Sequence, residues 1–451
     1  MRFLDLDKAI VFALLLRVWQ SVAGVVGLML IAAFFTAELQ GFYYTFSSLL
    51  SLQIFVELGL YGVVQTLASR EWSRLSLNDD GYVIGDPSAS SRLASLLHFV
   101  VKWYLVVSLF FAIGVGIAGH SFLSTPDHTA VDWIAPWWSV VALATLQLWL
   151  MPIVTILEGC NQVAEINRFR FIQAVAEAIT LWSLILGEAE LWVAAGVLCT
   201  KILSTVIFLA YRYRHFCISV WNSRQQSRID WRREIWPMQW RIGAQASVNY
   251  LHFSLFTPLM FYFYGPAVAG QMGMTLQIVI VIQMISIVWV QTKLPRFAIL
   301  AAQKLYQELD KTWWRASTIS FSLNIVGSLL MLLAIVLINH LQFSFSGRLL
   351  EPAPTSLFLL GFCLMQITGY QASYLRAHAK EPFLLLGVMG GLLNCALVFA
   401  FGSRFGPTGA AAGFAATIGF FMVPFGTYIW KRRRAEWQSD FALPKTDLSA
   451  K

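Results

Sequence analysis

The sequence has little charge and few of the groups that are typical of enzyme active sites. Only 12% of its 451 residues are Asp, Glu, Lys or Arg, against about 25% in an average soluble domain. Its five cysteines show no metal-type spacing, and there is no nucleophile elbow, HExxH pair or Gly-rich phosphate loop. These absences exclude an ordinary soluble domain and a zinc or disulfide framework. We expect neither enzymatic activity nor a bound cofactor.

Long apolar runs dominate instead. Hydrophobic residues make up 58% of the chain, and a helix needs about 20 consecutive apolar residues to cross the hydrocarbon core. We therefore predict an all-α, polytopic membrane protein with about 12 transmembrane helices. The predicted spans are 10–35, 42–66, 97–119, 134–158, 170–187, 191–211, 242–264, 267–292, 316–338, 355–377, 383–401 and 408–430.

The basic residues fall almost wholly into every second gap between these spans. Of the 32 Lys and Arg, 27 lie in alternate segments, two (Arg348 and Arg404) lie in the opposite gaps, and three lie within spans. Because cytoplasmic loops are enriched in Lys and Arg, we predict that both termini are cytoplasmic. The same bias accounts for most of the net charge of +8, and we expect no nucleic-acid partner.

The longest basic segment divides the predicted spans into six and six. Residues 212–241 mix Arg with Trp, a composition that suits a helix on the anionic inner leaflet and, equally, an ordinary cytoplasmic loop. We predict an N-terminal six-helix lobe (1–211), this linker (212–241), a C-terminal six-helix lobe (242–430) and a cytoplasmic tail (431–451). An even number of spans in each lobe gives the two lobes the same orientation.

Four ionisable residues within spans suggest two ion pairs. A charged side chain at the centre of a span costs at least ~2.5–3.5 kcal/mol, so it persists when it is paired, hydrated or functional. Glu177 and Lys201 are equally far from the turn between their spans, and Arg17 and Glu57 are at similar distances from theirs. This matched depth predicts the pairs Lys201–Glu177 and Arg17–Glu57. Structural neutralisation and ion coupling are alternative interpretations of the first pair.

Polar side chains form a stripe on two of the predicted spans. Span one carries Arg17 and Gln20 on one face, and span seven carries Arg241, Gln245 and Asn249. Lipid cannot satisfy such groups, so these faces should line water or protein. Bonding between helices is one interpretation, and a cavity shared by the two lobes is the other. Because arginine binds phosphate bidentately, such a cavity would favour an anionic head group.

Five stretches of the chain carry recognisable short motifs. They are Glu38–Tyr44, Phe55–Leu60 with Arg70 after it, Gly265–Gly270, Gly391–Asn394 and Gly406–Gly413. These stretches resemble the polysaccharide (O-antigen type) flippases of the multidrug/oligosaccharidyl-lipid/polysaccharide (MOP) exporter superfamily. With the six-plus-six layout, the resemblance covers essentially the whole chain.

The resemblance implies two six-helix lobes around a central cavity that opens alternately to each side of a bacterial inner (plasma) membrane. Its implied substrate is an undecaprenyl-pyrophosphate-linked oligosaccharide, the repeat unit of O-antigen lipopolysaccharide, capsule or exopolysaccharide. Arg17 and Glu57 lie where this family often carries basic and acidic residues, whereas Glu177 and Lys201 match no motif of it. The expected partners are the bilayer, this substrate and the polysaccharide polymerase or assembly proteins, with coupling to an H⁺ or Na⁺ gradient as an option.

Two other functions compete with this one. A MATE-like drug or cation exporter would need an acidic cavity, whereas Arg and Lys at least balance Glu in the spans. A membrane-embedded glycosyltransferase or polymerase would need catalytic acids on an outer loop, for which only Asp127 and Asp132 are candidates. Lipid II flippases usually have fourteen spans, two more than we predict here.

Overall fold

The chain folds into two compact, almost entirely helical units in a computed structural model, which describes residues 2–125, 130–223, 229–343, 346–378, 380 and 382–439. Unit 1 comprises Met1–Tyr250 with Gly265–Gly270, and unit 2 comprises Leu251–Tyr264 with Gln271–Lys451. The division therefore falls inside the seventh predicted span, and the lobe boundaries expected from the sequence stay a prediction. Asp127 and positions 440–451 of the predicted tail lie outside the described residues.

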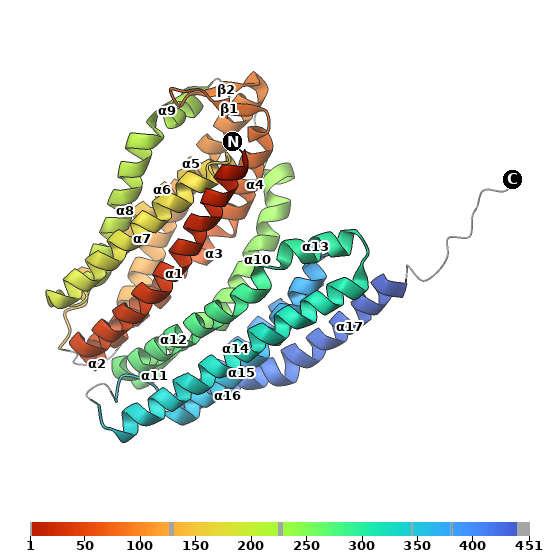
Figure 1. Ribbon diagram of the computed structural model, residues 1–451. Coiled ribbons are helices and arrows are strands. Elements are labelled where there is room, and N and C mark those ends of the chain that lie inside the picture. The colour runs from red at the N-terminus through yellow and green to blue at the C-terminus, as the bar shows by residue number, and fades with distance from the viewer. Residues whose placement is uncertain are drawn as a thin grey trace. The chain divides into compact units, whose positions relative to one another are not determined.

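Unit 1 contains the first ten helices and a small β-hairpin (Figure 1). Its elements are α1 (Arg2–Phe34), α2 (Ala37–Leu50), α3 (Gln53–Glu57), α4 (Leu60–Trp72), β1 (Leu75–Leu77), β2 (Val83–Gly85), α5 (Pro87–Leu123), α6 (Ile134–Gly159), α7 (Val163–Leu186), α8 (Trp192–Arg212), α9 (Arg214–Asn222), the π-helical turn η1 (Trp231–Ile235) and most of α10 (Trp236–Phe253).

The helix ends of unit 1 follow ordinary capping chemistry. Thr36 begins α2, where its hydroxyl accepts a hydrogen bond from the Leu39 N–H at 3.2 Å. Asp86 begins α5, where its carboxylate accepts from the Ser88 N–H at 2.9 Å and Pro87 occupies the first turn. The antiparallel pair β1–β2 connects α4 to this capped end.

Buried polar bonds join the membrane helices of unit 1. Trp19 on α1 donates its indole N–H to the Ala174 carbonyl on α7, at 3.2 Å. Also on α7, the Gln173 amide donates to the Lys201 carbonyl at 3.0 Å and lies 2.9 Å from the Ser204 hydroxyl of α8. Figure 1 shows α1, α7 and α8 side by side. These bonds satisfy polar groups that lipid cannot.

Two of the stretches that carry the resemblance contact each other within unit 1. A Cβ atom on Gly41 would lie only 1.9 Å from the Pro266 carbonyl oxygen. Beside it, the Gln40 side-chain amide donates to the Gly270 carbonyl at 2.8 Å. Only glycine leaves room for this backbone contact, which gives a packing reason for the small residues in both stretches.

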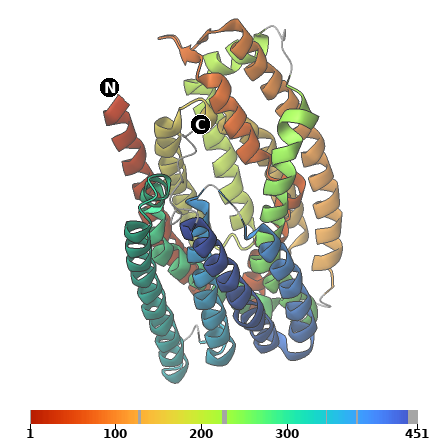
Figure 2. The ribbon, with the colours of Figure 1, turned by 90° about the vertical axis from the view of Figure 1, so that its right-hand side faces the viewer.

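Unit 2 contains the helices after α10. They are α11 (Phe256–Tyr264), α12 (Pro266–Gln291, whose first turn belongs to unit 1), α13 (Leu294–Ala302), α14 (Tyr306–His340), α15 (Pro352–Arg376), α16 (Leu384–Ala416), the π-helical turn η2 (Thr417–Met422) and α17 (Val423–Ser439). Gly406 interrupts α16 with φ 63° just before Pro407, so this element consists of two helices across a kink. Figures 1 and 2 show α14 to α17 running alongside one another.

A neutral hydrogen-bond network occupies the core of unit 2. The Tyr370 hydroxyl lies 2.6 Å from Gln366 Oε1 and 2.7 Å from Ser320 Oγ. The Gln366 amide donates to Ser286 Oγ at 2.7 Å, and Ser320 Oγ donates to the Ser286 carbonyl at 2.7 Å. Trp313 donates its indole N–H to the Tyr370 carbonyl at 2.9 Å. All five side chains are buried, so α12, α14 and α15 are joined by bonded polar groups.

The described part of the chain contains nine helices long and apolar enough to cross a membrane, or ten if α2–α4 is one broken span. It is therefore a multi-pass membrane protein. The tenth predicted span, 355–377, corresponds to α15, whereas the eleventh and twelfth, 383–401 and 408–430, lie on either side of the Gly406 kink within the apolar stretch Leu384–Trp437. The fifth span is longer than predicted, because α6 and α7 are joined by a turn of only three residues, 160–162. Twelve spans and cytoplasmic termini remain predictions.

Candidate functional site

Glu57 lies at a break in the second predicted span. Leu58 and Gly59 have φ angles of 48° and 69°, and the helices on either side are bent by 50°. A Cβ atom on Gly59 would lie 2.5 Å from Ile242 Cγ2 and 2.8 Å from the Gly243 nitrogen on α10. The break is therefore held by a backbone contact with α10 that requires glycine.

The break buries the Glu57 side chain. Its residue is 9% exposed, and its Oε1 atom is buried without a hydrogen-bond partner. Arg17, its predicted partner, has an exposed side chain on α1. The Oε1 atom of Glu57 accepts no hydrogen bond from Arg17, and the predicted Arg17–Glu57 pair stays a prediction.

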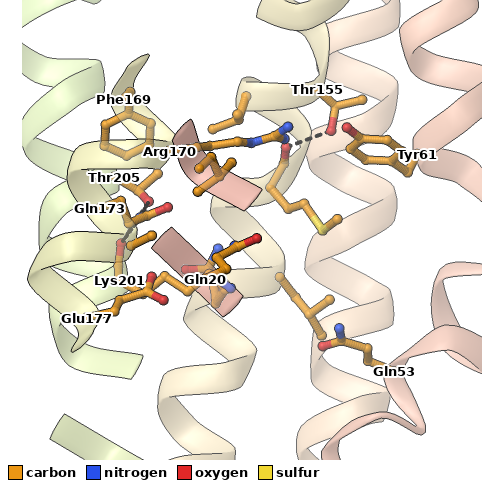
Figure 3. Close-up of a pocket in the computed structure, with 16 residues that line it drawn as sticks. Gln20, Gln53, Tyr61, Thr155, Phe169, Arg170, Gln173, Glu177, Lys201 and Thr205 are labelled. Atoms are coloured by element: carbon orange, nitrogen blue, oxygen red, sulfur yellow. Dashed lines mark hydrogen bonds between the residues drawn. The ribbon is translucent and has the colours of Figure 1, made fainter. Parts of the chain in front are cut away.

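A pocket of about 300 Å³ lies inside unit 1, among α1, α3, α4, α6, α7 and α8 (Figure 3). We call it the polar pocket. Its apolar wall consists of Leu16, Leu148, Met151, Val154, Phe169 and Ala174. Its polar and charged lining consists of Gln20, Gln53, Tyr61, Gln147, Thr155, Arg170, Gln173, Glu177, Lys201 and Thr205.

Glu177 and Lys201, the predicted ion pair, both line the polar pocket. Figure 3 shows them next to each other where α7 meets α8, and their charges interact. No direct salt bridge joins them in the part of the chain that the structure describes. The positive charge of Lys201 therefore partly neutralises the negative charge of Glu177, and both side chains line the pocket. Whether they have a role in function stays a prediction.

A second pair of opposite charges stands at the other side of the polar pocket. Arg170 forms a salt bridge with Glu158 of α6, whose side chain is only 5% exposed. The Tyr61 hydroxyl donates to the other oxygen of the same carboxylate. Glu158 thus has a partner on each oxygen, and the charge of Arg170 is already matched inside the protein.

The remaining predicted site residues have different positions. Gln20 lines the polar pocket from α1. Arg241 is exposed on α10, and its guanidinium lies 5.7 Å from the centre of the Trp240 ring. Gln245 and Asn249 belong to the same helix, but their side chains lie outside what the structure describes. A binding role for Arg17, Gln20, Glu57, Arg241, Gln245 and Asn249 stays a prediction, as does a cavity shared by two lobes.

Several residues in and beside the pocket lining were not predicted. Glu158, which pairs with Arg170 of the lining, occupies the last position of the predicted fourth span, where a carboxylate is ordinary. Gln53 and Tyr61 flank the break at Leu58 and Gly59. Gln147 is the single amide of the predicted fourth span. A lone amide or a helix break was the available signal, and neither identifies a pocket without the fold.

Comparisons with known proteins give a fold but no close relative. No family model matches the sequence, and no curated protein matches it. Solved structures do match. The lipid II flippase MurJ, in an inward closed conformation, has a TM-score of 0.65 at 11% identity over 96% of this chain and 90% of that chain. The MATE multidrug transporter DinF-BH, in a ligand complex, has a TM-score of 0.62 at 13% identity over 95% and 96%.

A third structure matches over almost its whole length. An inward-facing multidrug resistance MATE transporter of the MOP superfamily has a TM-score of 0.58 at 12% identity, covering 93% of this chain and 99% of that chain. The chain therefore has the fold of MOP superfamily transporters. At such low identity, the likeness establishes the fold alone, and fold does not by itself determine function.

Proposed function

We propose that this protein is a flippase that moves a lipid-linked oligosaccharide across the inner membrane of a bacterium by alternating access. The proposed substrate is an undecaprenyl-pyrophosphate-linked repeat unit of O-antigen, capsule or exopolysaccharide. The observation that carries the proposal is the polar pocket, which sets charged and amide side chains among membrane-spanning helices with a transporter fold. Ionisable groups within spans mark substrate or ion pathways by default.

The chemistry of the lining supports an oligosaccharide more than a purely apolar ligand. Amide and hydroxyl groups form most of the polar lining. Such groups can both donate hydrogen bonds to sugar hydroxyls and accept hydrogen bonds from them. A large head group attached to a lipid tail also needs a protein that offers polar surface inside the bilayer. MurJ, which shares this fold, is itself a flippase for a lipid-linked substrate.

A drug exporter is the second candidate, because two of the three structural neighbours described above are MATE transporters. An exporter of cations would benefit from unpaired carboxylates facing the cavity. In the polar pocket, however, Lys201 accompanies Glu177, and Arg170 is joined to Glu158. This balance of charge favours a neutral polar head over a cation. A glycosyltransferase or polymerase is favoured by no observation here.

Deletion of the chain in its own host tests the proposal. We expect lipid-linked oligosaccharide to accumulate on the inner leaflet, measured by the access of a membrane-impermeant sugar-modifying enzyme in spheroplasts and in inverted vesicles. Shortened polymer with normal lipid-linked repeat units would instead identify a polymerase. Altered drug tolerance with normal surface polysaccharide would identify an exporter. Glycosyltransferase genes beside this one would further support the flippase.

A further inference from the structure

We propose that the polar pocket is a subsite for one sugar residue of the substrate and that it does not hold the pyrophosphate. This inference rests on the proposed function and makes it more specific. It differs from the expectation for a cavity shared by two lobes, in which arginines would favour an anionic head group, because the polar pocket lies within unit 1 and contains neither Arg17 nor Arg241. Three properties of the pocket carry it: its charge, an acceptor atom without a partner, and its size.

The charges of the pocket cancel. Arg170 and Lys201 are its two cations. Glu158 forms a salt bridge with Arg170, and Glu177 interacts with Lys201 on the pocket wall. A site for pyrophosphate needs several uncompensated cationic donors. Pyrophosphate in this pocket would instead meet the carboxylate of Glu177, so the lining disfavours a multiply charged anion.

One atom of the lining requires a hydrogen-bond donor. Gln147 faces the pocket from the middle of α6, and its Oε1 atom is buried without a partner. Leaving a buried acceptor unpaired is costly, and a turn of the Gln147 side chain toward the pocket would let a ligand that donates satisfy this oxygen. Sugar hydroxyl and acetamido groups can donate, whereas an ionised pyrophosphate has only acceptors. An ammonium group could donate too, but Lys201 would repel it.

The remaining lining offers one aromatic surface for the apolar face of a sugar ring and amide groups for its hydroxyls. Phe169 is held in place by stacking on Phe208, with ring centres 4.1 Å apart, and offers a flat apolar surface. Gln20 and Gln53 bring further amides from α1 and α3. At about 300 Å³, the pocket is at the lower end of the range for ligand sites, about 300–1,000 Å³. It therefore has room for one ring and not for a whole oligosaccharide head.

Direct binding of free probes tests the subsite. The purified full chain in lipid nanodiscs is mixed with galactose, rhamnose, N-acetylglucosamine, glucuronic acid or inorganic pyrophosphate, and saturation-transfer NMR reports contact. We expect a signal from at least one neutral sugar and none from pyrophosphate. Gln147→Leu should weaken that sugar's binding about tenfold, as the loss of one buried hydrogen bond implies. The matched variant Gln303→Leu, at an exposed position on the other unit, should not.

Charge variants give a second measurement, in cells. If the charges only balance each other, the double variant Glu177→Gln/Lys201→Gln should support more surface polysaccharide than either single variant, at equal protein levels. If the double variant is as defective as Lys201→Gln alone, Lys201 binds an anion and the inference is overturned.

The failures of the subsite and of the flippase assignment can be told apart. Pyrophosphate that binds, competes with the sugars and requires Lys201 would overturn the subsite, as would the absence of binding by every sugar. Either result leaves the deletion assay unaffected. If deletion causes no accumulation of lipid-linked oligosaccharide and the cationic dye ethidium binds in the polar pocket instead, the proposed function fails together with the inference.

Discussion

The two units use different polar chemistry inside their bundles. Every buried acidic side chain among the described residues (Glu57, Glu71 and Glu158) belongs to unit 1, and the polar pocket adds half-buried charges to the same unit. The described core of unit 2 buries hydroxyl and amide groups instead, centred on Tyr370 and Gln366. Among the described residues, unit 1 thus buries carboxylates below a tenth of exposure, whereas the acidic side chain closest to the core of unit 2, Asp310, stays 20% exposed in its salt bridge with Arg434.

The two kinds of buried polar group differ in what they contribute to the stability of the fold. A fully bonded neutral network rigidifies a core at modest cost. Buried charges cost several kcal/mol each to desolvate, and replacing a buried ion pair by apolar residues is often neutral or stabilising. The charges of unit 1 are therefore poor candidates for stabilising groups and good candidates for functional ones. We infer that unit 1 holds the substrate contacts and that unit 2 is the more rigid scaffold.

The largest expected effect comes from breaking the charge pair beside the polar pocket. Arg170→Ala leaves the carboxylate of Glu158 buried with only Tyr61 as a partner, which should lower the free energy of unfolding by about 3 kcal/mol. Thermal unfolding of the purified protein measures it. The matched change Arg432→Ala removes an exposed i,i+4 pair with Glu436 and should cost under about 1 kcal/mol. Equal losses in the two variants would contradict the pairing.

The second-largest expected effect concerns the hydrogen-bond network of unit 2, which we expect to stabilise the fold without contacting the substrate. Tyr370→Phe removes the hydroxyl that contacts both Gln366 and Ser320, so a buried acceptor loses its donor and stability should fall by about 2 kcal/mol. Surface polysaccharide should stay normal at a growth temperature at which the variant remains folded. A stable variant with defective transport would show that unit 2 also contacts the substrate.

The sequence predicted the helices and the membrane class, because both depend on local periodicity and counting. It did not predict that Arg170 is matched by Glu158, because that pair forms only when the three-residue turn at 160–162 brings α7 back against α6. Nor did it predict the break at Leu58 and Gly59, which turns Glu57 into the protein, because depth along a span does not determine which way a side chain points.

A smaller effect is expected at Glu57. An isolated ionised carboxylate is costly to bury, and the Glu57 Oε1 atom is buried without a hydrogen-bond partner. Glu57→Gln keeps the shape of the side chain and removes that charge, so it should change the free energy of unfolding by less than about 1 kcal/mol. A loss of about 3 kcal/mol or more would reveal a cationic partner and support the predicted ion pair.

The smallest expected effect lies outside the membrane helices, where η1 meets α5. Burial raises the pKa of Glu234, but the hydrogen bonds from Arg92 and from the Asp230 N–H outweigh it, so the pKa falls below its ordinary value of 4.5. A carboxylate whose pKa is lower in the folded state stabilises the fold above that ordinary value, and this contribution is lost as the pH falls through the folded pKa.

Glu234→Gln should accordingly lower the free energy of unfolding by about 0.5–1 kcal/mol at about pH 7, and with it the thermal midpoint, as expected for a partly exposed pair. It should make no difference at about pH 3. Glu188→Gln, on an exposed turn between α7 and α8, serves as the control and should be neutral at both pH values. If Glu234→Gln still has the lower thermal midpoint at about pH 3, the contact between η1 and α5 depends on the packing of this side chain and not on its charge. The Arg92–Glu234 pair at the periphery of unit 1 would then stabilise the fold in a different way from the charge pair beside the polar pocket.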